Sequence, residues 1–227
     1  VVAIAIAAAS RQLQHRADLP PAGSPVYEQT TRAFYRGLAE LQVGLLDDAK
    51  RDFAHAAELV PDEPASWANL GLASLRLGEF DAASAPIERA IGLAPAESDL
   101  RFLRGRMQAS RGKIDDGIAD YRKAADLDGG NMRVRYALAE ELERAGGPAA
   151  DAERRTLLDV ILSKYPGNLA VLLERARLAA SRADDVTLRD SVAQLAQPSL
   201  GWPAAALEQY QGLQRAVAAG IYADAAR

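Results

Sequence analysis

The chain contains no cysteine, few aromatic residues and few histidines. Aromatic residues make up 6% of its 227 residues, and there are two histidines. The absence of cysteine excludes disulfide scaffolds, thiolate metal sites and cysteine nucleophiles, and it leaves the redox compartment open. Low aromatic content beside abundant alanine favours closely packed helices over a β-sandwich.

The chain also lacks a strong excess of charge of either sign. Its formal net charge is −4, and acidic and basic residues are mixed along most of its length. Proteins that bind nucleic acid usually present a basic stripe, so we expect no nucleic-acid partner. A hydrophobic content of 49% in 227 residues is enough to build a substantial core, and we expect a folded protein.

Motifs of catalytic and cofactor-binding sites are missing as well. His15 and His55 have no partner at a metal-binding or catalytic spacing, and the chain has no phosphate-binding glycine loop or nucleophile elbow. The carboxylate pairs 47–48, 115–116 and 184–185 fall in turns or just inside expected helices. Acidic side chains there cap amide groups and favour the helix dipole. We therefore expect no enzymatic activity, no cofactor and no metal.

An uninterrupted apolar run occupies the start of the chain, from Val1 to Ala9. It is shorter than the roughly 20 apolar residues that span a bilayer. We interpret residues 1–10 as the end of a membrane anchor or signal peptide that lacks its beginning, with a disordered or tag-like terminus as the alternative. Residues 11–26 are rich in proline and turn formers and predict a linker to a domain that begins near Tyr27.

Glycine recurs with a fixed spacing of 34 residues, at Gly44, Gly78, Gly112 and Gly146. A second series in the same frame is Gly37, Gly71 and Gly105, with Ala139 in the fourth place. Such a period indicates stacked repeats, each made of a first helix (helix A), a turn and a second helix (helix B). The expected repeats are 30–63, 64–97, 98–131, 132–168, 169–202 and 206–227, of which the last is incomplete.

The second repeat carries the residues that make this pattern specific: Trp67, Leu70, Gly71, Gly78, Phe80, Ala83, Ala90 and Pro95. In these positions the chain resembles the tetratricopeptide repeat family. The resemblance implies an all-α fold over residues 27–227, a right-handed α-solenoid of about five to six stacked antiparallel helix pairs. Gly71 is then expected where the two helices cross, and Gly78 is expected to end helix A with a positive φ.

Three departures from the pattern lead to further expectations. The proline that closes the fourth repeat, Pro166, arrives three residues late and predicts an insertion in that repeat's turn. The turn of the fifth repeat, residues 182–185, has no glycine. Pro86 lies inside helix B of the second repeat and predicts a kink there, unless the helix tolerates it on its solvent face.

By the family's geometry, helix A of each repeat lines a groove that receives a peptide or protein segment. The resemblance implies that this groove is apolar near its beginning and charged further on. Its expected lining is Phe34, Leu38, Leu41, Leu72, Leu75, Arg76, Phe102, Arg106, Arg133, Tyr136 and Glu140. Family members that clamp a free carboxylate use Lys and Asn where this chain has Phe34 and Leu38, so we expect no carboxylate clamp.

Two classes of function remain open from the sequence. One is an adaptor or assembly factor that binds a protein segment, and the other is a structural subunit or spacer docked permanently within a larger complex. A further alternative is that residues 11–26 of the chain itself cover the apolar end of the groove. The groove would then have a structural role and would not bind a partner there. The alanine-rich composition resembles repeat segments of large bacterial envelope proteins. We expect an envelope location, membrane-anchored or periplasmic, with the cytoplasm as the alternative.

Overall fold

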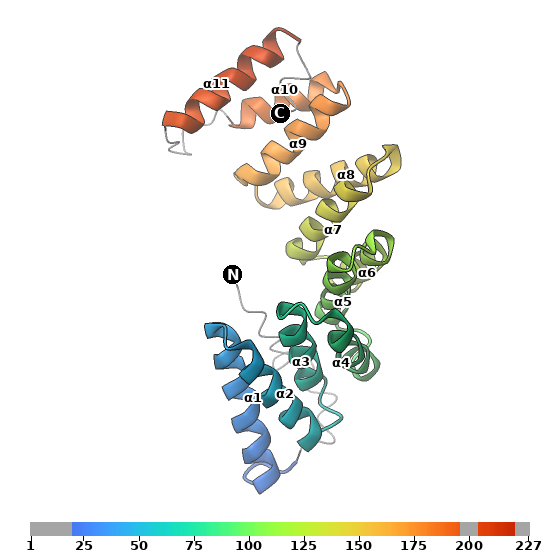
Figure 1. Cartoon of the computed structure of the whole chain (residues 1–227). Helices are drawn as coiled ribbons and strands as arrows, with labels where there is room; N and C mark the ends of the chain where they lie inside the picture. Colours follow the sequence, from blue (N-terminus) through green and yellow to red (C-terminus); the bar gives the residue numbers. More distant parts are fainter. Residues whose placement is uncertain (1–19, 196–203, 221–227) are drawn as a thin grey trace. The chain divides into compact units, whose positions relative to one another are not determined.

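Every regular element in the described part of the chain is an α-helix (Figure 1). The computed structural model describes residues 20–195 and 204–220. The chain divides into two compact units, which we call the N-terminal unit (Val1–Val134) and the C-terminal unit (Arg135–Arg227). Consecutive helices stack in pairs, which confirms the expected all-α solenoid class.

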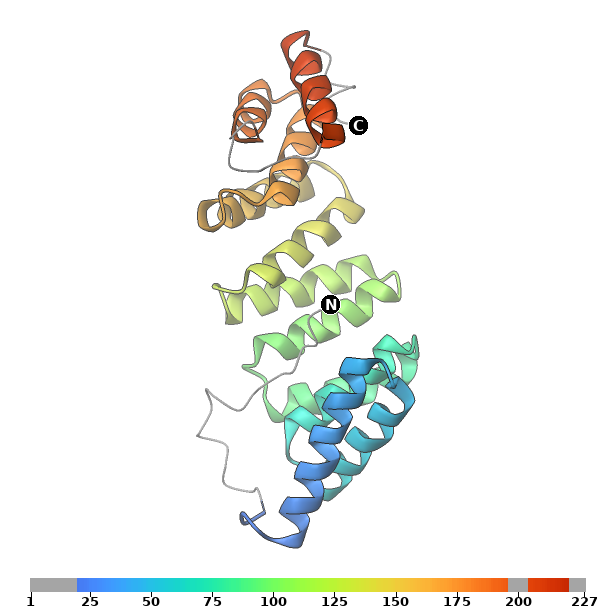
Figure 2. The same ribbon diagram turned by 90° about the vertical axis from the view of Figure 1, so that its left-hand side faces the viewer.

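Three antiparallel helix pairs make up the described part of the N-terminal unit (Figures 1 and 2). They are α1 (Pro25–Val43) with α2 (Leu46–Leu59), α3 (Pro64–Arg76) with α4 (Phe80–Leu93), and α5 (Ser98–Ser110) with α6 (Ile114–Leu127). The odd-numbered helices are the A helices and the even-numbered ones the B helices. Helix α1 begins at Pro25 and is capped by Ser24, whose side chain accepts a hydrogen bond from the Tyr27 amide at 3.2 Å.

Helix α7 (Met132–Ala145) begins before the division and continues into the C-terminal unit. That unit also contains α8 (Pro148–Lys164), α9 (Leu169–Ser181), α10 (Asp185–Leu195) and α11 (Ala204–Ala218). Helix α9 packs on α8 and pairs with α10, and α11 contacts α10. The expected terminal segment 1–10, most of the linker and the end of the sixth repeat lie outside the described residues.

Close approach of the two helices in each pair depends on the small residue in the middle of helix A. A Cβ atom at Gly71 would lie 2.5 Å from Cγ1 of Ile87 on α4, well inside an ordinary carbon–carbon contact. Gly37 and Gly105 face Phe53 and Tyr121 in the same way. The prediction that Gly71 marks the crossing point of the pair is confirmed.

The turns between paired helices end helix A with a left-handed residue. Gly78 has a φ of 79°, and the amide of Glu79 donates to the Ser74 carbonyl at 2.9 Å, which satisfies an acceptor at the helix end. Gly44, Gly112 and Gly146 also have positive φ. In the fifth repeat this position is taken by Ala183, whose φ of 53° is the one positive value for a non-glycine residue within the described ranges.

The expected insertion in the turn of the fourth repeat is wrong in its location. Helix α7 ends at Ala145 and α8 begins at Pro148, so the turn is not longer than the others. Helix α8 has 17 residues, whereas α2, α4 and α6 have 14 each. The three additional residues extend helix B, because proline fits the first turn of a helix and Pro148 starts α8 directly after the two glycines.

Helix α3 lies at the centre of the N-terminal unit's core. It packs on α2 and α4 and also contacts α5, and ten of its 13 residues are buried. Leu70, Leu72 and Ala73 join a single apolar cluster with side chains from α1, α2, α4 and α5. Helix α4 is continuous through Pro86, so the helix tolerates this proline, and the kink stays a prediction.

Candidate peptide-binding surface

The first three predicted groove residues lie on α1 and differ in exposure. Phe34 and Leu38 are half-buried and pack against the apolar core, where the ring centroid of Phe34 lies 5.8 Å from that of Phe53. Leu41 is fully buried in the same core. Phe34 and Leu38 therefore keep some surface for a partner, and Leu41 keeps none.

On α3, the predicted groove residues are two buried leucines and an exposed arginine. Leu72 and Leu75 are buried and belong to the apolar core. Arg76 extends towards α1, where its Nη1 donates to the carbonyl oxygen of Leu41 at 2.7 Å. This contact places a positive charge near the C-terminal end of α1, where a cation favours the helix dipole.

The next group combines an aromatic ring with two arginines. Phe102 on α5 is buried, and the guanidinium of Arg133 lies 4.6 Å from its ring centroid. Arg133 also forms an ion pair with Asp99 at 2.5 Å. Arg106, also on α5, is half-buried and has no acidic partner among the described residues. This part of the surface is basic, with one guanidinium whose charge is not neutralised.

Four predicted side chains are therefore not available as groove lining: Leu41, Leu72, Leu75 and Phe102. We expected them on an exposed surface, and that expectation is wrong. The small residues in the A helices bring neighbouring helices close, so a long apolar side chain at these positions fills the space between helices. The assignment of the other seven residues to a binding surface stays a prediction. Residues 11–19, which could cover Phe34 and Leu38, lie outside the described residues.

In the C-terminal unit, the predicted residues lie in an acidic environment. Tyr136 is half-buried, and its burial together with the charge of Glu140 raises the pKa of the phenol. Partial burial, and then the carboxylates of Glu174 and Glu143, raise the pKa of Glu140. Arg154 is buried among these groups and pairs with Glu143 at 2.9 Å and with Glu174. This surface would repel an acidic ligand.

A set of ion pairs that was not predicted from the sequence connects helix A to helix B. In the third repeat, Arg104 on α5 binds Asp120 on α6, with Nη2 at 2.6 Å from Oδ1, and Glu88 on α4 at 3.0 Å. In the first repeat Arg36 binds Asp52, which lowers the pKa of that carboxyl. The signal was in the sequence, because Arg36 and Arg104 are separated by two repeats of 34 residues.

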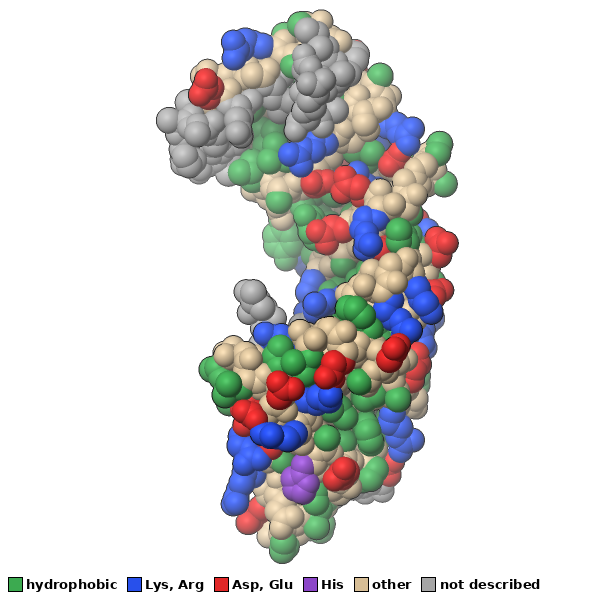
Figure 3. Space-filling model, in the orientation of Figure 1, with side chains coloured by type: hydrophobic (Ala, Val, Ile, Leu, Met, Phe, Trp, Pro, Cys, Tyr) green, Lys and Arg blue, Asp and Glu red, His purple; other side chains and the backbone are tan. Residues whose placement is uncertain are grey.

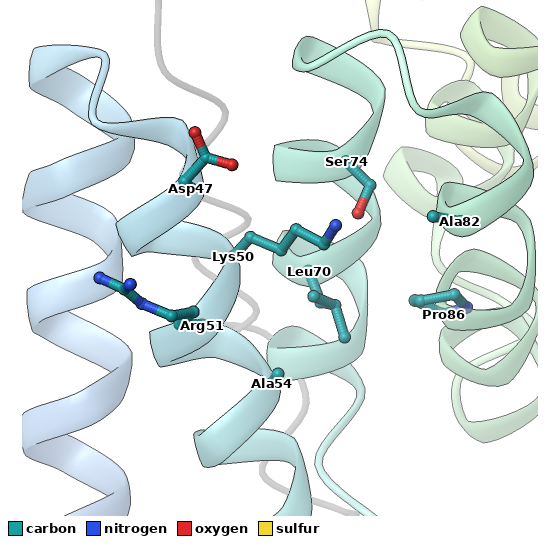
Figure 4. Close-up of a pocket in the computed structure, with 8 residues that line it drawn as sticks. All are labelled: Asp47, Lys50, Arg51, Ala54, Leu70, Ser74, Ala82 and Pro86. Atoms are coloured by element: carbon teal, nitrogen blue, oxygen red, sulfur yellow. The ribbon is translucent and has the colours of Figure 1, made fainter.

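A surface pocket between α2, α3 and α4 was missed as well (Figure 4). Its volume is about 470 Å³. Leu70 and Ser74 of α3 face it, with Ala54 on α2 and Pro86 on α4 at its sides. In the space-filling view, apolar side chains on the visible face of the N-terminal unit lie beside acidic and basic ones (Figure 3). The pocket lies beside the B helices, away from the predicted groove.

Among the described residues, no cluster of three or more His, Cys, Asp or Glu side chains has a metal-binding arrangement. None of the described helices combines the length and hydropathy needed to cross a bilayer. The side chain of Asp184 accepts a hydrogen bond from the Thr187 amide at 3.1 Å, which lowers the pKa of this carboxyl. This confirms that Asp184 caps helix α10, whose first residue is Asp185.

Antiparallel helix pairs define an α-solenoid built from short repeats. The two helices of a pair are joined by a turn that contains a residue with positive φ, and these turns recur at intervals of 34 residues. The tetratricopeptide repeat model matches residues 34–98 and 75–131. The chain is a tetratricopeptide repeat protein. Proteins of this family generally mediate protein–protein interactions and are generally non-catalytic scaffolds.

A relative by sequence is cellulose synthase 2 operon protein C of Komagataeibacter xylinus. The two are 31% identical over 177 residues, which cover 76% of this chain. The matched part is only 13% of the relative's length. The similarity therefore concerns a repeat segment of a much longer bacterial protein.

Solved structures agree with the fold. PilF of Pseudomonas aeruginosa has a TM-score of 0.68 over 89% of this chain and 90% of its own, with 19% identity. MamA has a TM-score of 0.62 over 74% of this chain and 88% of its own, with 15% identity. The first tetratricopeptide domain of Spaghetti (RPAP3), bound to the HSP90 peptide SRMEEVD, has a TM-score of 0.50 over 53% of this chain and 95% of its own, with 18% identity. At these identities the similarity concerns the fold alone.

Proposed function

We propose that the chain is a non-enzymatic scaffold that binds an acidic, amphipathic segment of a partner protein on its A helices, in the role of an assembly factor. The observation that carries the proposal is Arg106, a half-buried guanidinium without an acidic partner among the described residues. A cation partly removed from water gains strongly from a ligand carboxylate. Arg76 and Arg133 add positive charge, and Phe34 and Leu38 offer partly exposed apolar surface.

Peptide binding by a protein of similar fold supports this proposal. The Spaghetti (RPAP3) domain binds the HSP90 peptide SRMEEVD. In this chain Phe34 and Leu38 stand where carboxylate-clamping relatives have Lys and Asn. The proposed ligand is therefore an internal segment with acidic side chains and an apolar face, and it does not depend on a free C-terminus.

The test uses the purified chain and fluorescently labelled amphipathic peptides that share one apolar face and differ only in acidic or basic polar residues. We expect the acidic peptides to bind and the basic ones not to bind, as measured by fluorescence anisotropy. Arg106→Glu should weaken binding at least about tenfold, since a hydrogen bond to a charged group contributes about 1.5–3 kcal/mol.

The matched control is Lys123→Glu, which makes the same charge change at an exposed position of α6. It should leave the affinity unchanged. Equal binding of acidic and basic peptides, or equal effects of the two variants, would contradict the proposal.

The second candidate is a structural or spacer segment docked permanently within a larger protein. It is supported by the relative from Komagataeibacter xylinus, because this chain matches only 13% of that protein's length. Hydrogen exchange on a longer natural form of the protein tests it. Protection of Phe34, Leu38 and Arg106 amides by other parts of the same polypeptide would favour this candidate, and the same protection only on addition of a peptide would favour the scaffold.

We also propose a location in the bacterial cell envelope, with the apolar residues 1–10 as the tether or export segment, against the cytoplasmic alternative. Fractionation of bacteria that express the chain with and without residues 1–10 tests this. We expect membrane or periplasmic material that is lost on deletion. Cytoplasmic recovery of both forms would contradict the proposal.

A further inference from the structure

The pocket between α2, α3 and α4 occupies a place that the next repeat fills with its own side chains. Ala54, Leu70 and Pro86 each stand 34 residues before Glu88, Arg104 and Asp120, the ion-paired triad that joins the second and third repeats. All three charged residues are thus replaced by apolar ones at the junction of the first and second repeats. The space that the long arginine side chain fills in the third repeat is here part of a cavity of about 470 Å³.

A fourth lining position follows the same trend. Ser74 stands where the third repeat has Gln108, so a long polar side chain is replaced by a short one. Ser74 is only 1% exposed, and its Oγ has no hydrogen-bond partner. Buried hydroxyls usually have a partner, because leaving one without a hydrogen bond costs about 1–3 kcal/mol.

A second hydrogen-bond acceptor arises from the proline within α4. Pro86 has no N–H, so the carbonyl of Ala82, four residues earlier, lacks the donor that a helix normally provides. Ala82 and Pro86 both line the pocket, opposite Ser74 and Leu70 (Figure 4). The pocket thus combines apolar walls with the unpaired hydroxyl of Ser74, and the carbonyl left without its helical donor belongs to another lining residue, Ala82.

The rim of the pocket carries a carboxylate without an ion pair among the described residues, that of Asp47. Its counterpart one repeat later, Asp81, is paired with Arg111 at 3.0 Å. Lys50 and Arg51, the basic residues at the pocket, are already paired, with Glu79 and Asp48 respectively. The charge that a ligand can still neutralise at this rim is therefore negative.

We propose that this pocket binds the side chain of a tryptophan on a partner protein, with a lysine or arginine beside it in the partner's sequence. Indole supplies a large apolar area and one N–H donor without an acceptor, which matches the unpaired Ser74 hydroxyl between apolar walls. An aliphatic side chain would leave Ser74 unpaired. The neighbouring cation meets Asp47. This site lies beside the B helices and is independent of the surface proposed for acidic segments.

The first experiment titrates the ¹⁵N-labelled full chain with the blocked peptide acetyl-Gly-Trp-Lys-Gly-amide and follows amide resonances by NMR. We expect shifts confined to residues 47–54, 70–74 and 82–87. The peptide with Leu for Trp should bind more weakly, and so should the one with Glu for Lys. Equal affinity of the Trp and Leu peptides, or shifts elsewhere only, would overturn the proposal.

The second experiment fills the pocket with the side chains that stand at the corresponding positions one repeat later. The triple variant Ala54→Glu, Leu70→Arg, Pro86→Asp installs the triad of the third repeat, and we expect it to abolish binding while circular dichroism stays helical. Ser74→Ala keeps the pocket's shape and should weaken binding roughly fivefold through loss of one hydrogen bond. Undiminished binding by either variant would contradict the proposal, and Ser74→Ala decides it if the triple variant does not fold.

Matched controls separate this site from its surroundings. Asp47→Asn should weaken binding of the lysine-containing peptide, and Asp81→Asn, at the same position one repeat later, should not. Arg106→Glu should also leave binding intact, so a failure of the acidic-segment proposal is distinguishable from a failure of this one. Equal loss in the Asp47 and Asp81 variants would overturn the assignment of the rim.

Discussion

Replacing Gly71 by alanine tests the packing of the repeats most directly, because two opposing effects can be separated. Alanine is favoured over glycine inside a helix by about 0.8–1.0 kcal/mol. Against this, the new Cβ would lie 2.5 Å from Cγ1 of Ile87, where ordinary carbon contacts are about 3.5–4.0 Å. Ile87 is fully buried, and the atom met, Cγ1, is not the flexible end of its side chain.

Overpacking of this kind costs about 1–3 kcal/mol, and the short distance at Gly71 favours the upper part of that range. We therefore expect Gly71→Ala to destabilise the protein by about 1–2 kcal/mol net. For a chain of this size each kcal/mol lowers Tm by about 2–4 °C. Urea unfolding followed by circular dichroism measures the change.

The sign should reverse when Ile87 is shortened. In an Ile87→Ala background the clash is gone, so Gly71→Ala should then stabilise by about 1 kcal/mol, through helix propensity. The matched control is Gly92→Ala on α4, because a Cβ there meets nothing within 4 Å and should stabilise the wild type by a similar amount. The reasoning is refuted if Gly71→Ala stabilises the wild type as much as Gly92→Ala.

Three further changes have predictable effects. Ala183→Gly should stabilise by about 0.5–1 kcal/mol in urea unfolding, because it relieves a left-handed alanine; a loss of stability would contradict the strain. Asp184→Ala should cost about 1 kcal/mol at pH 7 through loss of a cap. The folded-state pKa of Asp184 is lowered, so its contribution is present above the unfolded pKa of about 3.9 and should vanish as the pH falls through the folded value; a difference independent of pH would refute this. Leu72→Glu should lower Tm strongly, since it buries a carboxylate, and an unchanged melt would show that Leu72 is not in the core.

The repeat architecture was predictable because its signals are local. A residue with positive φ ends each A helix, and a small residue is needed at each crossing point, so in the first three repeats glycine marks both positions in the sequence at a constant interval. The location of the three additional residues in the fourth repeat was not predictable in this way. Both an extended turn and an extended helix delay the closing Pro166 by the same amount.

The candidate surface was only partly predictable, because exposure depends on the neighbouring helix. Family geometry assigns Leu41 and Leu72 to the same side as Arg76, but the distance between adjacent A helices decides that the leucines are buried. The pocket beside Leu70 required a different comparison, of each position with its counterpart one repeat later. That comparison shows from the sequence alone that Leu70 stands where the next repeat has Arg104.

The triad formed by Glu88, Arg104 and Asp120 connects α4 of the second repeat to α5 and α6 of the third. The corresponding junction between the first and second repeats has Ala54, Leu70 and Pro86 in its place. Ion pairs occur at both junctions, since Lys50 binds Glu79 across the first one, but at these three positions only the second junction is charged. Salt screens the charges of the triad, and sodium sulfate strengthens burial at the three apolar positions, so the ionic composition of the surroundings changes the relative strength of these contacts at the two junctions.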